Sequence, residues 1–354
     1  MAEFFDSLRV GNLELKNRII MSPMTRSRAD DAGIQPDYTV DYYVQRASAG
    51  LIITEAVNIS PMAKGYVRTP GIYTPKQTKA WKKVAAAVKE KGGKIFMQLF
   101  HTGRIALPDF LPDNVKPVAP SAVRAKGQNY TDGGMKDFVE PREITREEIR
   151  QTIQDFAAAA KNAVEAGFDG AELHAASGYI VQQFLSTNAN LRQDEYGGSI
   201  ENRARFLLET IDAMIEAVGA ERVGIKLSPR MGFNDIEETD ADALYAYVVK
   251  NLSERNLAYL HVSAVGGQGW HAKLRPLFGG VYFANAGLTR ETGEKLLTEN
   301  SADAIVYGAL FLANPDLPER FVKSAELNQP DKSTFYTPGE KGYTDYPTLE
   351  QAAA

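Results

Sequence analysis

Short apolar runs rich in β-branched residues alternate along the chain with longer segments of helical periodicity. An apolar run bounded by turn residues is typical of a buried strand, and apolar positions three or four apart are typical of one helix face. The pattern predicts strands at residues 18–23, 51–56, 94–100, 168–174, 222–228, 257–263, 281–284 and 304–307. It predicts helices at residues 37–49, 75–91, 145–166, 203–218, 240–256, 289–300 and 314–326.

Eight strand–helix repeats favour a (β/α)8 TIM barrel, since a doubly wound sheet usually has fewer units in a domain. The length of 354 residues would also allow two smaller domains, but no interdomain linker is evident. We therefore expect one barrel domain over residues 1–354. The segment 4–15, with a Gly11-Asn12 turn, predicts an N-terminal hairpin that closes the barrel floor.

Two helix starts carry capping signals. Thr145 and Thr289 are predicted N-caps, and only Thr145 is followed three residues later by the glutamate of a capping box, Glu148. Two long excursions, 102–142 and 329–354, break the strand–helix repeat. The first follows the carboxyl end of a strand, so we expect it to lie over the barrel mouth. Substrate choice would depend on these two segments.

Composition narrows the chemistry. The absence of cysteine excludes disulfides, thiolate nucleophiles and cysteine-ligated metal centres. The chain has only four histidines, which argues against a zinc site, so we expect no metal. A net charge of −5 without a basic stripe argues against a nucleic-acid partner. No secretory signal or membrane-spanning apolar stretch is visible, which predicts a cytoplasmic protein. We expect a small-molecule substrate and a monomer or small homo-oligomer.

Polar groups cluster where the predicted strands end, and active sites of these barrels form at the carboxyl ends of their strands. A glutamine, a threonine and a cation among them suit the edge of a flat heteroaromatic ring such as a flavin. The residues converging on the mouth are Pro23, Met24, Thr25, Glu55, Ala56, Gln98, His101, His174, Ser177, Tyr179, Lys226, Asn285, Ala286, Gly287, Gly308 and Ala309.

Several motifs then resemble one family over essentially the full length of the chain. They are NRIIMSPMTR at 17–26, QRASAGLIITEA at 45–56, GGKIFMQLFHTGR at 92–104, AGFDGAELHAASGY at 166–179, DEYGGSIENRARF at 194–206, LANPDLPERF at 312–321 and GYTDYPTL at 342–349. In this order they resemble the old yellow enzyme family of FMN-dependent ene-reductases. The resemblance implies a barrel that binds FMN, takes hydride from NAD(P)H and reduces α,β-unsaturated carbonyl compounds.

The resemblance also implies residue roles. Tyr179 matches the proton donor to the α-carbon, and His174 with Ser177 matches the pair that binds the substrate carbonyl oxygen. Aromatic positions around the substrate are Tyr66, Phe100 and Tyr336. For the cofactor, Thr25 matches the group at the flavin O4 edge, Gln98 the pyrimidine ligand and Lys226 the cation at the N1/O2 edge. The remaining matched cofactor positions are Pro23, Met24, Ala56, Ala286, Gly287, Gly308 and Ala309.

Four of these positions depart from the family pattern. Ser177 stands in place of histidine or asparagine, and Lys226 in place of arginine, which loses the planar fork. Ala309 replaces the arginine that binds the FMN phosphate, and Ala286 replaces the first glycine of the phosphate-binding pair. We therefore expect FMN binding to be weakened unless another cation, such as Arg290, replaces the missing guanidinium.

These departures leave a second hypothesis open. A flavin-free barrel could bind a small molecule, or isomerise or cyclise a carbonyl compound with Tyr179 and His174 as acid–base groups. Glu55 and His101 could form another acid–base pair, although support of neighbouring site residues is the simpler interpretation. The Gly267–Ala272 segment fits a loose dinucleotide fingerprint, but we reject it because the residues that follow, Lys273-Leu-Arg-Pro276, are not expected to open a regular helix. Trp270 and His271 receive no role.

Overall fold

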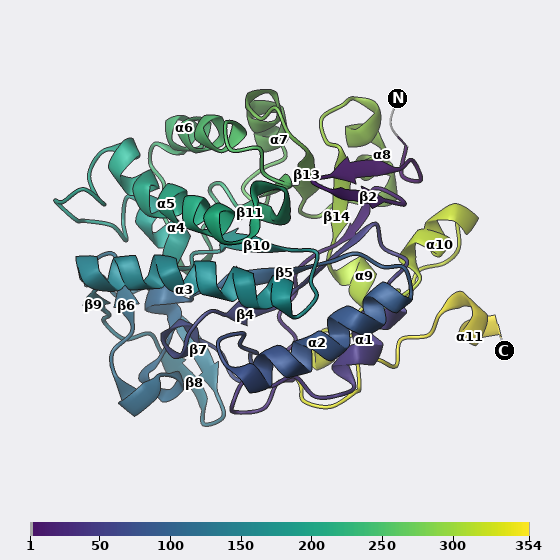
Figure 1. Cartoon of the computed structure of the whole chain (residues 1–354), viewed down its shortest axis with the longest axis horizontal. Coiled ribbons are helices and arrows are strands. Elements are labelled where there is room, and N and C mark those ends of the chain that lie inside the picture. Colours follow the sequence, from purple (N-terminus) through teal and green to yellow (C-terminus); the bar gives the residue numbers. More distant parts are fainter. Residues whose placement is uncertain (1–2, 354) are drawn as a thin grey trace.

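Eight parallel strands form a closed barrel in the computed structural model, which describes residues 3–353 (Figure 1). Consecutive strands pair with each other, and the last one pairs with the first to close the ring. The (β/α)8 prediction is confirmed, and each predicted strand is present within about two residues of its expected ends. The strands are β3 (Ile19–Met21), β4 (Leu51–Asn58), β5 (Ile95–Phe100), β10 (Gly170–Ala175), β11 (Val223–Leu227), β12 (Tyr259–Ser263), β13 (Tyr282–Asn285) and β14 (Ala304–Tyr307).

All the predicted helices are present outside the strands (Figure 1). Both threonine caps are confirmed, and Thr292 closes the second capping box in place of a glutamate. The helix predicted at residues 203–218 begins three residues earlier, at Ile200, because Ser199 is its N-cap. The helices are α1 (Thr39–Gln45), α2 (Pro75–Glu90), α3 (Arg146–Glu165), α5 (Ile200–Val218), α6 (Ala241–Ser253), α8 (Arg290–Thr298) and α10 (Leu317–Lys323).

Short helices that the pattern did not predict lie in the connections: α4 (Ile180–Leu185), α7 (Gly269–Leu274), α9 (Ala309–Ala313) and α11 (Leu349–Ala353). One of them, α7, begins at Gly269 and ends before Pro276, and a 3-10 turn follows, so no regular helix opens at residues 273–276. Single 3-10 turns occupy η1 (Pro61–Ala63), η2 (Gly103–Ile105), η3 (Pro108–Phe110), η4 (Pro112–Asn114), η5 (Ala220–Arg222), η6 (Phe233–Asp235), η7 (Arg275–Leu277) and η8 (Lys332–Thr334). Among the described residues, no helix has the length and apolar composition needed to cross a bilayer.

The N-terminal hairpin closes the barrel floor as predicted. Its strands β1 (Leu8–Val10) and β2 (Leu13–Leu15) are antiparallel, and Val10 and Leu15 join the apolar cluster inside the barrel. Above them, the rings of Tyr259 and Phe283 stack at 4.3 Å. Gly224 makes room for this layer, because a Cβ atom there would lie 2.3 Å from the Tyr259 ring. The packed interior forms the base of the mouth.

The 102–142 excursion covers part of the mouth, as expected. It contains β6 (Val118–Ala119), paired with β9 (Arg142–Glu143), and a hairpin of β7 (Gln128–Thr131) and β8 (Gly134–Asp137). Asn129 ties the hairpin down by donating to Gly65 O at 2.7 Å and Ile105 O at 3.0 Å. Phe138 and Leu107 of the excursion share an apolar cluster with Tyr179.

The C-terminal tail is held by buried arginines from the start of the chain. Arg46 stacks over Tyr42, whose ring stacks on Tyr343 of the tail at 4.0 Å. Buried guanidinium groups need acceptors for their hydrogens. Arg26 and Arg28 find them in the tail backbone, at the carbonyl oxygens of Thr334, Phe335, Gly339, Lys341 and Gly342.

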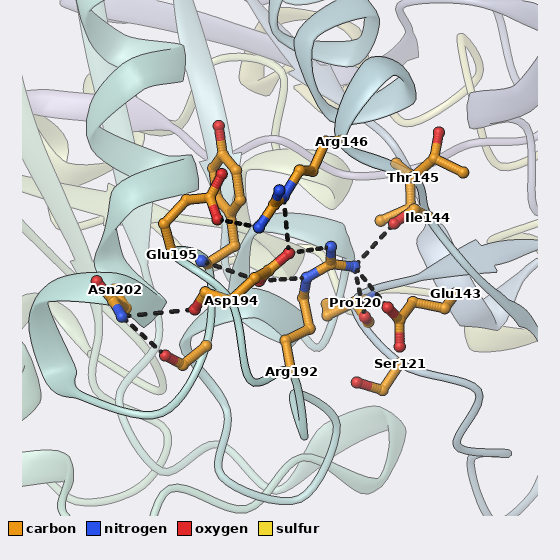
Figure 2. A network of polar contacts seen from close by, with 12 residues as sticks. Pro120, Ser121, Glu143, Ile144, Thr145, Arg146, Arg192, Asp194, Glu195 and Asn202 are labelled. Atoms are coloured by element: carbon orange, nitrogen blue, oxygen red, sulfur yellow. Dashed lines mark hydrogen bonds and ion pairs between the residues drawn. The ribbon is translucent and has the colours of Figure 1, made fainter.

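A second buried arginine network explains the polar motif at 194–206 (Figure 2). The side chain of Arg192 is 5% exposed, and its guanidinium donates to the two carboxylate oxygens of Asp194, from Nε at 2.9 Å and from Nη2 at 2.6 Å. It donates in addition to Pro120 O at 3.1 Å, in the middle of the 102–142 excursion, and to Ile144 O at 2.8 Å, just after its end. The motif therefore clamps the excursion to the barrel, which is a structural role.

Asp194→Asn should show how much the Arg192–Asp194 contact contributes to the free energy of unfolding, and how that contribution depends on pH. Hydrogen bonds from Arg192 lower the pKa of Asp194 to about 2, so its stabilisation is complete above about pH 4 and is lost progressively as the pH falls from there through about 2. We expect the variant to lose about 1–2 kcal/mol of unfolding free energy at pH 7, after allowance for solvent screening, and the difference to narrow by pH 3. Urea unfolding at both pH values measures it.

The control is Glu195→Gln, which removes a more exposed ion pair with Arg146 on the same segment. Its effect should stay within about 0.5 kcal/mol. A loss in Asp194→Asn that is the same at pH 7 and pH 3 would contradict the electrostatic interpretation.

Candidate functional site at the barrel mouth

Neighbouring strands place the predicted site residues side by side. Residues paired across β4, β5, β10, β11 and β12 lie at the same level, because the strands are parallel and in register. Gln98 pairs with Ala56 on one side and with Glu172 on the other, while Lys226 pairs with His174 and His261. The mouth therefore brings together candidates from most of the strands.

A chain of buried hydrogen bonds crosses the mouth. Glu172 has no exposed surface, and its two carboxylate oxygens contact Gln98 Nε2 at 2.7 Å and His261 Nδ1 at 3.0 Å. The other ring nitrogen of His261 lies 3.0 Å from Asn285 Nδ2, which also donates to Ser22 Oγ at 3.2 Å. Burial lowers the pKa of His261, so the ring is neutral, with Nδ1 as donor and Nε2 as acceptor.

This chain determines what Gln98 and Lys226 offer to a ligand. Since the amide nitrogen of Gln98 is committed to Glu172, its carbonyl oxygen is free to accept a hydrogen bond from a ring N–H. Lys226 is 9% exposed, and within residues 3–353 its ammonium has no hydrogen-bond or ion-pair partner. Burial lowers its pKa, and nearby Glu172 opposes that effect. One acceptor and one cation therefore face the mouth.

An aromatic group lines the other side of the mouth. The His174 ring lies 4.9 Å from the Tyr179 ring, and Phe100 lies 5.5 Å from Tyr179. The Tyr179 hydroxyl donates to the Tyr66 hydroxyl at 3.1 Å. Tyr336, on the tail, is 60% exposed and lies near enough to influence Tyr179. The structure thus groups the predicted proton donor with the predicted aromatic positions.

The protonation states of this group suit acid catalysis. Burial raises the pKa of Tyr179 well above its usual value, and Tyr66 and Tyr336 add to the rise. The phenol is therefore protonated at neutral pH. Burial lowers the pKa of His174 well below its usual value, with Lys226 adding to the effect, and Nδ1 has no partner in the described part of the chain. His174 is a neutral ring with an unused polar atom at the mouth.

Ser177 sits in a left-handed turn at the mouth, with φ +57°. Its backbone N–H donates to Ser228 Oγ at 2.9 Å, and its carbonyl oxygen accepts from Asn234 at 2.8 Å. Asn, Asp and Gly tolerate this backbone region more readily than serine does. The departure at this position leaves a short side chain on a turn that both backbone hydrogen bonds hold in place.

The residues at the ring end fit a flavin, and those at the phosphate end fit less well. Pro23, Met24 and Thr25 are half-buried after β3, and a Cβ built on Gly308 would meet only Met24 Sδ at 3.7 Å and Ser22 Cβ at 3.8 Å. Gly287 has open space around it. Ala309, which begins α9, is exposed and brings no charge.

Arg290 does not replace the missing guanidinium. Its side chain donates to Glu294 at 2.9 Å and Ser324 at 2.9 Å and lies over the Phe321 ring. Ala286 is strained, because φ is +103°, a region that L residues rarely adopt. Both observations are consistent with the expected weakening of phosphate binding.

Two sets of residues considered from the sequence lie outside the mouth. Glu55 accepts from Gln35 Nε2 at 2.7 Å, and burial raises its pKa to about 7. His101 accepts from Gly103 N at 3.0 Å, and burial lowers its pKa to about 3. No contact joins the two among the described residues, so the acid–base pair was wrong. His271, in α7, contacts Tyr282 instead.

Three residues at the mouth were missed by sequence reasoning. Glu172 stands two positions before His174 on the same strand, so strand alternation places both side chains inside the barrel and could have revealed it. His261 had the same signal in the middle of β12, two positions before Ser263. Asn234 carried no sequence signal, since it lies 57 positions from its partner Ser177.

Ala286→Gly should raise the free energy of unfolding by about 1 kcal/mol, because glycine adopts φ +103° without strain. Ala284→Gly is the matched control two residues earlier, inside β13; its φ is not positive, so it should destabilise by about 0.5–1 kcal/mol. Thermal unfolding of both variants measures the difference. Equal destabilisation by the two substitutions would contradict the strain at Ala286.

Comparison with known proteins agrees with this geometry. Residues 3–328 match the family model of the NADH:flavin oxidoreductase / NADH oxidase family. A probable flavin mononucleotide-dependent alkene reductase of Leishmania infantum is 44% identical, over 97% of this chain and 96% of that protein. 12-Oxophytodienoate reductase 1 of Oryza sativa subsp. japonica is 45% identical, over 97% of this chain and 92% of that protein.

A solved structure is similar throughout. Morphinone reductase in complex with tetrahydroNAD has a TM-score of 0.96 and 44% sequence identity, and the match covers 100% of this chain and 99% of that chain. The family model and the relatives confirm the resemblance seen in the sequence motifs. The chain belongs to the NADH:flavin oxidoreductase family that includes old yellow enzyme.

Proposed function

We propose that this protein is an FMN-dependent oxidoreductase that uses NAD(P)H to reduce the activated C=C bond of α,β-unsaturated carbonyl compounds. The observation that carries the proposal is that two pairs of groups lie at one barrel mouth. The first pair is the protonated Tyr179 and the neutral His174, and the second is the Gln98 carbonyl and the Lys226 ammonium. The first pair suits a carbonyl substrate and the second suits the edge of a flavin. Family membership supports the same activity.

The cofactor would be held mainly at its ring. Gln98 would accept from the pyrimidine ring, Lys226 would place positive charge at the N1/O2 edge, and Thr25 would bind the O4 edge. Pro23, Met24, Ala56, Ala286, Gly287, Gly308 and Ala309 would line the rest of the site. The chemistry that bound FMN would supply is the transfer of hydride from the nicotinamide to the β-carbon of the substrate.

The protein's own side chains complete the reduction. His174 donates a hydrogen bond to the substrate carbonyl oxygen, where negative charge develops, and Ser177 lies on the same turn. Tyr179 transfers its phenolic proton to the α-carbon, so hydride and proton together saturate the double bond. Tyr66, Phe100 and Tyr336 pack around the substrate. The net reaction consumes one NAD(P)H and one proton for each C=C bond.

The relatives favour this activity over the flavin-free isomerase or cyclase that the sequence left open. The relatives are named for two different compounds, 12-oxophytodienoate and morphinone. The class of substrate is therefore proposed, without a single compound. A cytoplasmic location and a monomer or small homo-oligomer stay predictions from the sequence.

The proposed function is tested on purified protein incubated with excess FMN and then freed of unbound flavin. We expect a yellow protein that oxidises NADPH or NADH only when 2-cyclohexenone is present and that forms cyclohexanone. A colourless protein, or nicotinamide oxidation without any saturated product, would contradict the proposal.

Tyr179→Phe should separate the two half-reactions. Oxidation of the reduced enzyme by 2-cyclohexenone should slow at least about a hundredfold, since it needs a proton on carbon, while reduction by the nicotinamide should be nearly unchanged. Anaerobic stopped-flow absorbance measures both rates. Equal slowing of the two half-reactions would indicate a damaged site and remove Tyr179 from the donor role.

Ala309→Arg should tighten FMN binding by about one to two orders of magnitude, since it restores a guanidinium beside the phosphate. Ala309→Gln is the matched control, because it adds a side chain of similar reach without charge. Flavin fluorescence titration of the apoproteins gives the affinities, and the melting temperature at fixed FMN should rise accordingly. An equal gain in both variants would show that charge is not what the site lacks.

A further inference from the structure

The loop after β11 packs directly against the turn that carries Tyr179. Gly178, just before Tyr179, has φ +74°, and a Cβ atom built on it would lie 2.6 Å from Asn234 Cβ and 2.6 Å from Phe233 O. Real Cβ atoms do not come that close to other atoms, so only glycine permits the approach. The contact brings the Asn234 side chain to the proton-donor turn.

The backbone of Asn234 is held firmly. Asn234 has φ +58°, a conformation that asparagine tolerates better than most residues. The buried Arg104 guanidinium donates to Asp235 O at 2.6 Å and to Asn234 O at 3.4 Å. A side-chain amide on such a fixed backbone keeps a defined direction.

The Asn234 side chain contacts two residues of the site. Its amide nitrogen donates to Ser177 O at 2.8 Å. It also interacts with the Tyr66 hydroxyl: burial raises the pKa of Tyr66, and hydrogen bonds from Tyr179 and Asn234 oppose that rise. Asn234 therefore bridges the Tyr179 turn and the phenol that contacts Tyr179.

Tyr179 needs a hydrogen-bond donor after it has given up its proton. Its oxygen then carries a negative charge in a buried position, where an unpaired charge is costly. Among the described residues, the Tyr66 hydroxyl, 3.1 Å away, is the group within hydrogen-bond distance of the Tyr179 oxygen. Tyr66 can turn its own O–H toward that oxygen while its lone pair keeps the bond from Asn234.

We propose that Tyr66 donates a hydrogen bond to the Tyr179 phenolate and that Asn234 is the positioning residue that holds Tyr66 in this role. In the step, the Tyr179 O–H bond breaks and a C–H bond forms at the substrate α-carbon. The negative charge stays on the Tyr179 oxygen, bonded to the Tyr66 O–H, until a proton from water restores the phenol. The inference rests on the proposed function, because it concerns the same proton transfer.

The test is a double-mutant cycle on the FMN-loaded enzyme. Tyr66→Phe should slow oxidation of the reduced enzyme by 2-cyclohexenone about ten- to a hundredfold, and Asn234→Gly about three- to tenfold. The double variant should be no slower than Tyr66→Phe alone, because Asn234 acts through the Tyr66 hydroxyl. Effects that multiply would overturn the inference.

Two further readouts separate positioning from general damage. Oxidation by ferricyanide and reduction by the nicotinamide need no proton on carbon, so both should be unchanged in Asn234→Gly. Asn256→Gly is the matched control, since Asn256 has φ +53° on an exposed turn before β12. It should match Asn234→Gly in melting temperature and match the wild type in every rate. Slower ferricyanide oxidation in Asn234→Gly would overturn the inference.

Asn234→Asp provides a second variant of nearly the same shape that tolerates the same backbone conformation but lacks both amide hydrogens. Its oxidation by 2-cyclohexenone should be slowed at least as much as that of Asn234→Gly. An oxidation rate equal to that of the wild type would contradict the role of the amide. A wild-type protein that binds FMN but fails to reduce the enone overturns the proposed function together with this inference. If the wild type reduces the enone but the effects of Tyr66→Phe and Asn234→Gly multiply in the double variant, this inference alone is overturned.

Discussion

The site depends on one fully buried carboxylate, Glu172, at the centre of the barrel mouth. A buried carboxylate is tolerated only when its oxygens have hydrogen-bond partners. Glu172 meets this requirement through Gln98 and His261, with Lys226 nearby. These partners come from three neighbouring strands, so satisfying Glu172 fixes the direction of several side chains at once. The Gln98 carbonyl and the Lys226 ammonium then face the mouth as a matched acceptor and cation.

The two ends of the proposed cofactor site differ in how well their residues suit FMN. The ring end keeps a complete set of buried contacts, extending from Gln98 to Ser22, while the phosphate end has Ala309 where a cation would bind and a strained Ala286. In the proposed function, hydride and proton transfer both take place at the ring end, beside Tyr179 and His174. Weaker phosphate contacts would therefore lower cofactor affinity without altering the groups that perform the reaction.

The sequence predicted the barrel strands well, because a buried parallel strand reads as an apolar run. It did not predict α4, in which all residues are buried and no amphipathic period exists. Glu55 was expected at the mouth, but a strand irregularity between Ile53 and Ala56 changes the alternation, and Glu55 contacts Gln35 instead. Asn234 could not be foreseen, since its place depends on how closely the β11 loop approaches Gly178.

The central claim is that the buried contacts at the mouth hold a flavin that exchanges hydride with an activated alkene. Anaerobic titration of the flavin-loaded protein tests it most directly. One equivalent of NADPH or NADH should bleach the flavin absorbance, and one equivalent of 2-cyclohexenone should then restore it. A flavin that is reduced by the nicotinamide but stays reduced when the enone is added would contradict the account.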